Sequence, residues 1–176
     1  MRTLLSWITF PGVILHEYGH AWACRRLGIR VIKVCYLRFG NPLGYVLHEQ
    51  PQSALQHILI AAAPVFVSTF AAFATSLAAA LLLFFQVAGV AADMAVPAAA
   101  WLSFSFALHA FPSSGDADAL WEDVSGNTVG FFGKTVLVPV VGLIRLVQLG
   151  NRFWLDALFA ILLIAIPPLL LAVYTS

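Results

Sequence analysis

The chain has 176 residues, of which 61% are hydrophobic and 10% are charged. About 25% of the residues of a soluble domain are charged, so this composition excludes an ordinary soluble protein and indicates an integral membrane protein. The formal net charge of +1 gives no electrostatic basis for a nucleic-acid partner. Since about 100 to 200 residues make one domain, we expect a single domain over residues 1–176.

Five hydrophobic runs are long enough to cross a membrane. A helix of about 20 residues spans the roughly 30 Å hydrocarbon core. The predicted spans are Leu4–Leu27, His57–Val87, Val90–Phe111, Val129–Leu149 and Phe153–Tyr174. Pro97 and Pro139 interrupt the third and fourth spans, but proline is tolerated in membrane helices where neighbouring groups pair the freed carbonyl. The predicted fold class is therefore an all-α polytopic membrane protein with about five spans.

The first span contains the sequence HEYGH, from His16 to His20. A secretory signal peptide would have an uncharged apolar core of 7 to 15 residues at this place. Because the core here would include two histidines and Glu17, we interpret the segment as an uncleaved span.

A basic segment follows the first span and holds Arg25, Arg26, Arg30, Lys33 and Arg38. Lys and Arg next to a span favour the cytoplasmic side, so Cys24 and Cys35 are expected to be free thiols in a reducing compartment. Residues 28–49 are also rich in β-branched and aromatic residues and are broken by Gly-Asn-Pro at 40–42. This pattern predicts a small β-hairpin between the first and second spans.

A second polar stretch, residues 109–128, separates the third and fourth spans and contains Asp116 and Asp118. Ser113 or Ser114 can cap a helix there, with both aspartates in its first turn, where the helix dipole favours negative charge. Because two spans separate this stretch from the basic segment, we expect both on the cytoplasmic side of the membrane.

The HEYGH sequence has the spacing of a zinc site. On a helix, His16 and His20 lie on one face and can bind one ion, while Glu17 is placed to act as a general base. Charged groups inside a membrane are costly and are functional candidates by default. We therefore predict one Zn²⁺ per chain, held by His16 and His20, with Glu17 as the catalytic residue.

Zinc needs at least one more protein ligand, and several residues are candidates. They are Asp116, Asp118, His109, His48 and Cys24. Cys24 continues the face of the two histidines, but about 6 Å further along the helix. His48, Glu49 and His57 are expected to be solvated near the membrane interface, and His109 is either a packed histidine or a group that orients substrate or water.

In its order of motifs the chain resembles the site-2 protease family of intramembrane zinc metalloproteases. HEYGH matches the family's HExxH, and RRLGIRVIKVCYLRFGNPLGYV resembles its basic segment and hairpin. Gly115-Asp116-Ala117 stands where the family has Leu-Asp-Gly. The resemblance implies that Asp116 is the third zinc ligand, with Asp118 as the alternative. It also implies that the hairpin over residues 30–48 binds substrate as an edge strand; the alternative is that the hairpin only covers the zinc site from the cytoplasmic side.

Two family motifs differ in this chain. Ala-Gly-Pro-x-x-Asn is replaced by AAPVFV at 62–67, and Asn-x-x-Pro by HAFP at 109–112, which aligns His109 with an asparagine. We expect a zinc-dependent endopeptidase that cleaves a membrane-spanning protein or peptide. The alternative is a non-catalytic zinc-binding scaffold or regulator of the same fold, and a transporter is a weaker third reading. The expected location is a prokaryotic plasma membrane, with the site nearer the cytoplasmic side.

Overall fold

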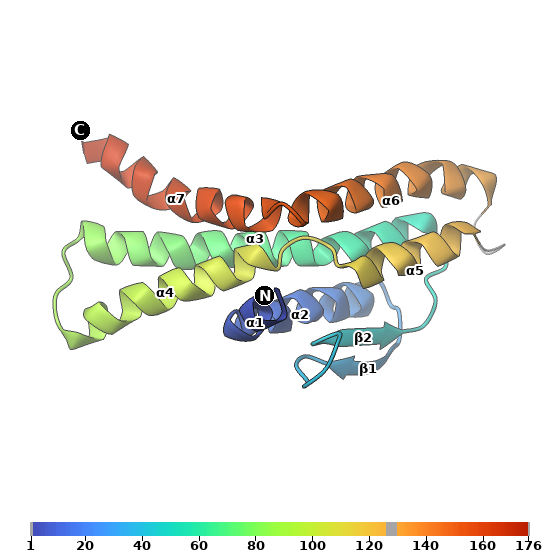
Figure 1. Cartoon of the computed structure of the whole chain (residues 1–176), viewed down its shortest axis with the longest axis horizontal. Helices are drawn as coiled ribbons and strands as arrows, with labels where there is room; N and C mark the ends of the chain where they lie inside the picture. Colours follow the sequence, from blue (N-terminus) through green and yellow to red (C-terminus); the bar gives the residue numbers. More distant parts are fainter. Residues whose placement is uncertain (1, 126–129, 176) are drawn as a thin grey trace.

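The computed structural model describes residues 2–125 and 130–175 and is mostly helical (Figure 1). The elements are α1 (Arg2–Ile8), α2 (Phe10–Arg26), β1 (Val31–Cys35), β2 (Tyr45–His48), α3 (Ala54–Phe84), α4 (Val90–Leu108), α5 (Ser114–Ser125), α6 (Phe131–Asn151) and α7 (Leu155–Thr175). The predicted start of the fourth span at Val129 lies outside the described residues.

Four helices in the described part of the chain are long and apolar enough to cross a membrane, rather than the five predicted. They contain the segments Leu55–Phe84, Val90–Leu108, Phe131–Asn151 and Leu155–Tyr174. Helices α4 and α6 continue through Pro97 and Pro139, as expected for proline in a membrane helix. These four helices support the assignment to an integral membrane protein.

The first predicted span, Leu4–Leu27, is divided at Thr9 into α1 and α2. The Thr9 hydroxyl donates a hydrogen bond to the carbonyl of Leu5 at 2.8 Å, and Pro11 lies in the first turn of α2. Proline is favourable there because the first-turn N–H groups have no helical partner. What remains is a 17-residue helix that carries the polar HEYGH sequence, so it is shorter and less apolar than predicted.

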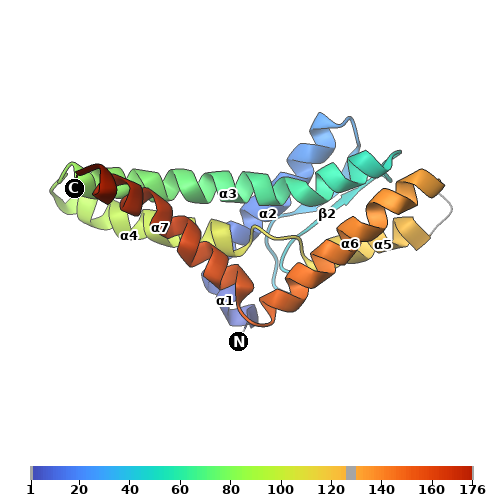
Figure 2. The same cartoon turned by 90° about the horizontal axis from the view of Figure 1, so that it is seen from above.

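Helix α3 is the central element and runs along most of the length of the molecule (Figure 1). Along one half it packs with α4 and α7, where Ala72, Ala107 and Ala160 are buried together. Along the other half it packs with α5 and α6 around Ala117 and Leu137. Figure 2 shows these two halves and the oblique course of α2 beside α3.

Glycines allow α2 to approach its neighbours closely. A Cβ atom on Gly19 would lie 2.9 Å from the Cα of Pro64 in α3, and one on Gly12 would overlap the carbonyl oxygen of Ser105 in α4. The Gly12 N–H also donates to the Ser105 hydroxyl at 2.7 Å. Small residues at membrane helix crossings let backbones come together in this way, and the crossings fix the position of the HEYGH sequence.

The predicted hairpin is confirmed. β1 and β2 pair antiparallel, with Cys35 opposite Tyr45 and Val34 opposite Val46. In the described part of the chain the sheet has only these two strands. Cys24 and Cys35 are free cysteines, as expected.

Candidate metal centre

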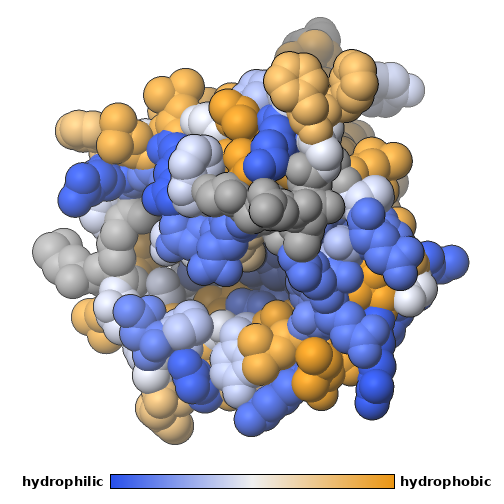
Figure 3. Space-filling view, turned by 90° about the vertical axis from the view of Figure 1, so that its right-hand side faces the viewer, coloured by the Kyte–Doolittle hydropathy of each residue, from blue (hydrophilic) through white to orange (hydrophobic). Residues whose placement is uncertain are grey.

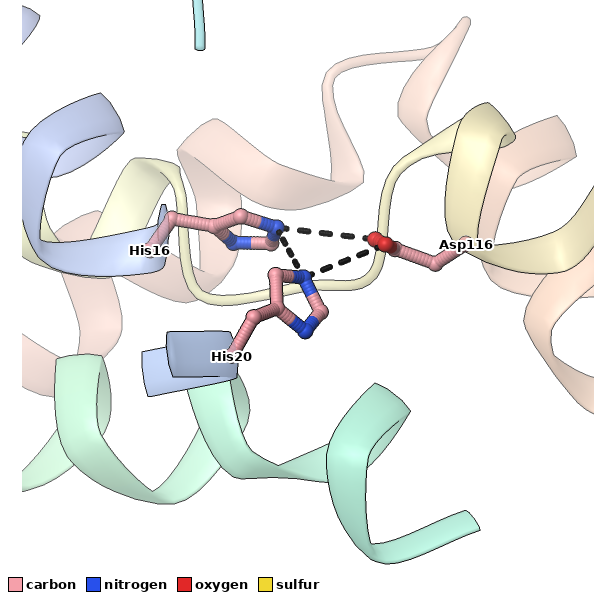
Figure 4. Close-up of side chains that lie close together, drawn as sticks. All are labelled: His16, His20 and Asp116. Carbon is pink, nitrogen blue, oxygen red and sulfur yellow. Dashed lines mark hydrogen bonds and ion pairs between the residues drawn. The ribbon is translucent and has the colours of Figure 1, made fainter. Parts of the chain in front are cut away.

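His16, His20 and Asp116 converge on one point although 96 residues separate the last two along the chain (Figure 4). Their candidate ligand atoms all lie within 4.8 Å of one another. The Nε2 atoms of the histidines are 3.2 Å apart, and the Asp116 carboxylate oxygens lie 3.5 Å from Nε2 of His16 and 3.1 Å from Nε2 of His20. Three such atoms around one point could hold a metal ion.

The two histidines come from the buried face of α2, and the aspartate comes from the first turn of α5. A spacing of four residues places His16 and His20 one turn apart on the same face. Both residues are almost fully buried, at 7% and 6% exposure. A buried cluster of this kind requires a partner for each polar atom.

Main-chain carbonyls fix the orientation of both imidazole rings. Nδ1 of His16 lies 2.8 Å from the carbonyl oxygen of His109, and Nδ1 of His20 lies 2.9 Å from that of Ile60. A carbonyl oxygen only accepts, so Nδ1 donates in each case, and a neutral ring keeps its lone pair on Nε2. Outer partners of this type orient metal-binding histidines in proteins, and here they direct both Nε2 atoms toward Asp116.

Asp116 is also part of a reciprocal cap at the start of α5. Its carboxylate accepts from the Ser113 N–H at 2.6 Å, and its own N–H donates to the Ser113 hydroxyl at 3.3 Å. This is a capping box in which aspartate takes the place of the usual glutamate, so the predicted cap at Ser113 is confirmed. The cap holds the carboxylate toward the histidines.

The charges around Asp116 favour its ionised form. Burial opposes ionisation, but the charge of the protonated imidazoles of His20 and His16 and their hydrogen bonds to the carboxylate outweigh this effect and hold the pKa of the Asp116 carboxyl well below its usual range. A metal ion would displace the Nε2 protons, and the ionised carboxylate with two Nε2 lone pairs is a suitable donor set for zinc.

Glu17 lies between the cluster and the hairpin. Its side chain packs so closely against Gly44 that a Cβ atom there would lie 2.6 Å from Cγ of Glu17. A side chain at position 44 would also meet the main-chain oxygens of Tyr36 and Cys35 at 3.0 and 3.1 Å. The glycine therefore lets the hairpin close over α2 at the residue that was predicted to act as a base.

A cavity of about 1180 Å³ adjoins the cluster. His16, Glu17, His20 and Asp116 line it, together with residues of β2, α5 and α6. Figure 3 shows hydrophilic residues gathered around a hollow at the end of the molecule where the hairpin, α5 and α6 lie. The cluster thus faces a space large enough for a peptide segment.

The other candidates for the third ligand lie elsewhere. Asp118, the alternative to Asp116, forms an ion pair with Arg145 at 2.5 Å and is 59% exposed. Cys24 is buried among Ala23, Ile29 and Ile60. His48 is on β2, where its Nδ1 lies 2.8 Å from the main-chain oxygen of the next residue.

His109 packs against the break between α1 and α2. Its Nε2 lies 2.8 Å from the Thr9 hydroxyl; since that hydroxyl donates to Leu5, it accepts from the imidazole. The side chain also lines the cavity, while its carbonyl orients His16. The imidazole of His109 is therefore packed against the chain at Thr9, as in the interpretation of His109 as a packed histidine.

The prediction that His57 is solvated is wrong. Only 7% of this residue is exposed, because it lies in the first turns of α3, against the chain that leaves the hairpin, with Nε2 3.3 Å from the carbonyl of Pro51. Glu49 is exposed, as expected, and lies 3.7 Å from Arg30.

Sequence reasoning named His109 only for its side chain, and it did not name Ile60 or Gly44 as supports of the site. His109 and Ile60 orient the histidines through main-chain carbonyls, which leave no side-chain signal, and Gly44 acts through the absence of a side chain.

Comparisons with protein-family models, with curated proteins and with solved structures gave no match for this chain.

Proposed function

We propose that this protein is a zinc-dependent intramembrane endopeptidase of the site-2 protease type. The observation that carries the proposal is the convergence of His16, His20 and Asp116 beside Glu17 on the wall of a large cavity. The four apolar helices provide the membrane setting. The substrate would be a membrane-spanning protein or peptide.

The residues fit a zinc ion better than a hard cation. Two imidazole nitrogens and one carboxylate form a set of three protein ligands of the kind found in catalytic zinc sites, whereas Mg²⁺ and Ca²⁺ prefer oxygen ligands. Zinc bound in this way supplies a water whose pKa is lowered to about 7. His16, His20 and Asp116 would hold one ion per chain.

Glu17 would perform the proton transfers. It is one residue from His16, and it lines the same cavity as the three candidate ligands. Its carboxylate would accept a proton from the attacking water and give it to the amide nitrogen of the leaving group, which is general acid–base catalysis.

The hairpin offers a way to present an extended substrate. β2 pairs only with β1 in the described part of the chain, and its residues Tyr45, Val46 and Leu47 line the cavity. An unpaired edge binds a peptide by adding it to the sheet. A transmembrane helix has its carbonyls in internal hydrogen bonds, so a substrate segment must unwind before cleavage, and the edge of β2 would stabilise the unwound form.

A second candidate function is a non-catalytic zinc-binding scaffold or regulator. It is favoured by the sequence AAPVFV at 62–67 and by His109, which stand where the family has asparagines.

We also propose that the protein lies in a prokaryotic plasma membrane with the site nearer the cytoplasmic side. The basic segment at residues 25–38 supports the cytoplasmic placement.

Glu17→Gln tests the proposal. The unaltered protein and the variant are reconstituted into liposomes with a solubilised membrane-protein extract, and new peptide termini are identified by mass spectrometry. General acid–base groups contribute about 10²- to 10⁴-fold to rate, so we expect cleavage to fall by that factor while zinc per chain is unchanged. Glu49→Gln is the matched control, because Glu49 lies on the exposed hairpin.

The outcomes separate the two functions. Equal cleavage by the unaltered protein and Glu17→Gln would refute the role of Glu17. One bound zinc per chain without cleavage by either protein would favour the scaffold.

A further inference from the structure

Exposed cations gather at the end of α2 and along the hairpin. They are five of the nine Lys and Arg residues of the chain, namely Arg25, Arg26, Arg30, Lys33 and Arg38. The elements that carry them, α2 and β1, contact each other, and we call these five residues together the cationic face.

The cationic face has little internal neutralisation. Arg30 lies 3.7 Å from Glu49, whereas in the part of the chain that the structure describes Arg25, Arg26 and Lys33 are within ion-pair distance of no carboxylate. A concentrated, unneutralised positive charge of this kind attracts an anionic surface.

Aromatic and aliphatic side chains are exposed among the cations. Trp22 is 41% exposed and lies under Arg26, with the guanidinium carbon 5.7 Å from the ring centroid. Ile32 and Leu47 on the two strands are 64% and 50% exposed. Trp and Tyr with Lys and Arg are typical of the level of the lipid headgroups, where rings and aliphatic groups face the acyl chains and cations face phosphate.

Tyr45 brings two of the cations together. Its ring centroid lies 5.8 Å from Nζ of Lys33 and 5.0 Å from the guanidinium carbon of Arg38. In the antiparallel register Tyr45 is opposite Cys35, two residues from Lys33, so Lys33 and Tyr45 project from the same face of the sheet. A phosphate at this point would meet two cations with restricted freedom.

We infer that the cationic face binds the headgroups of anionic phospholipids and holds the hairpin on the bilayer surface. A lipid partner fits better than a nucleic acid, because exposed apolar side chains lie among the cations and the same chain carries four apolar helices. Each Lys or Arg near an anionic surface favours association by about fivefold. Since Tyr45 and Leu47 also line the cavity, lipid bound at the cationic face would stabilise the position of the cavity wall.

Hydrogen exchange of the full chain in nanodiscs tests the inference. One set of nanodiscs contains phosphatidylcholine alone, and the other contains phosphatidylcholine with phosphatidylglycerol. We expect the main-chain amides of residues 30–48 to exchange more slowly in the anionic discs. The difference should disappear in 1 M salt, because the Debye length falls from about 10 Å at 0.1 M to about 3 Å.

A double variant and a charge-matched control identify the surface. Arg25→Gln with Lys33→Gln should reduce hairpin association roughly 25-fold, at about fivefold per cation. Lys134→Gln with Arg152→Gln removes the same charge from α6 and its end and should leave the protection unchanged.

Two results would overturn the inference. One is equal exchange of residues 30–48 in the two kinds of nanodisc. The other is an equal loss of protection in the control, which would mean that net charge rather than this face is responsible. Exchange of the α3 amides in the same samples shows whether each variant is folded. For the unaltered protein alone, comparing the two lipid compositions at low and high salt already tests the inference without any variant.

Discussion

Replacing Asp116 with asparagine should abolish stoichiometric zinc binding, whereas the same change at Asp118 should not. The two Asp116 oxygens lie 3.5 and 3.1 Å from the histidine Nε2 atoms, so the carboxylate is placed as a direct ligand. Loss of an outer partner of a metal ligand costs about 10- to 100-fold in affinity. Loss of a direct ligand should exceed about 100-fold, or about 2.8 kcal/mol at 1.4 kcal/mol per tenfold.

Asp118 supplies a control of the same residue type only two positions away. Its carboxylate is 59% exposed and pairs with Arg145, and an exposed pair contributes about 0 to 1 kcal/mol to stability. We therefore expect Asp118→Asn to bind zinc like the unaltered protein and to unfold at nearly the same temperature.

The measurement is a zinc dissociation constant from competition with a chromophoric chelator, with elemental analysis of zinc per chain and thermal unfolding in the same detergent. Asparagine can still accept the hydrogen bond from the Ser113 N–H, so Asp116→Asn should remain folded. Equal zinc affinity of Asp116→Asn and the unaltered protein would refute the three-residue site. A larger loss for Asp118→Asn would mean that the first turn of α5 presents the other aspartate.

Two further substitutions test the supports of the site by thermal unfolding. Gly12→Ala should lower the free energy of unfolding by about 1 to 3 kcal/mol, because the new methyl group overlaps the Ser105 carbonyl and overpacking has this cost; Gly142→Ala, which has open space around it, should cause no loss. Ser113→Ala should lower the free energy of unfolding by about 1 kcal/mol, because it removes the cap of α5. Ser114→Ala is the control, and an unchanged unfolding temperature of Ser113→Ala would contradict the importance of the cap.

The histidines of the candidate site could be predicted from sequence because their geometry is local. A spacing of four residues on a helix places His16 and His20 on one face whatever the rest of the chain does. Asp116 is 96 residues from His20, and no local pattern determines its distance from them. From the residues alone, five candidates for the third ligand could not be distinguished, and only the family resemblance favoured Asp116. The distance of Asp116 from the histidines depends on how α3, α4 and α5 pack.

The parts of the fold that depend on the length of a hydrophobic run could be predicted from the sequence. Each of the helices α3, α4, α6 and α7 is long and apolar enough to cross a membrane, and a hydrophobic run of that length predicts a membrane helix. The Leu4–Leu27 run contains Thr9 and Pro11. The N–H and the hydroxyl of Thr9 both donate to the Leu5 carbonyl, and Pro11 has no N–H with which to continue the helix. Hydropathy does not register these local effects, so one long span was predicted where the structure has two helices.

The burial of His57 was missed for a different reason. A histidine near a predicted interface is usually solvated, but the chain that leaves the hairpin passes over the start of α3, and the carbonyl of Pro51 supplies a partner for the imidazole. The short connection from β2 to α3 must pass close to His57 once the position of the hairpin is fixed. Because that position was not known from the sequence, the burial of His57 could not be predicted.

The arrangement around the cluster bears on the choice between an enzyme and a structural zinc protein. Structural zinc sites have four protein ligands and are closed, whereas catalytic sites keep one position open for water or substrate. In the part of the chain that the structure describes only three residues converge, and the cluster faces a cavity of about 1180 Å³. A structural site would also have no use for Glu17 on that wall, in close contact with Gly44. The open side of the cluster therefore favours the proposed catalysis. AAPVFV and His109, which stand where the resembled family has asparagines, bear on how a substrate would be held rather than on whether water could reach a bound metal.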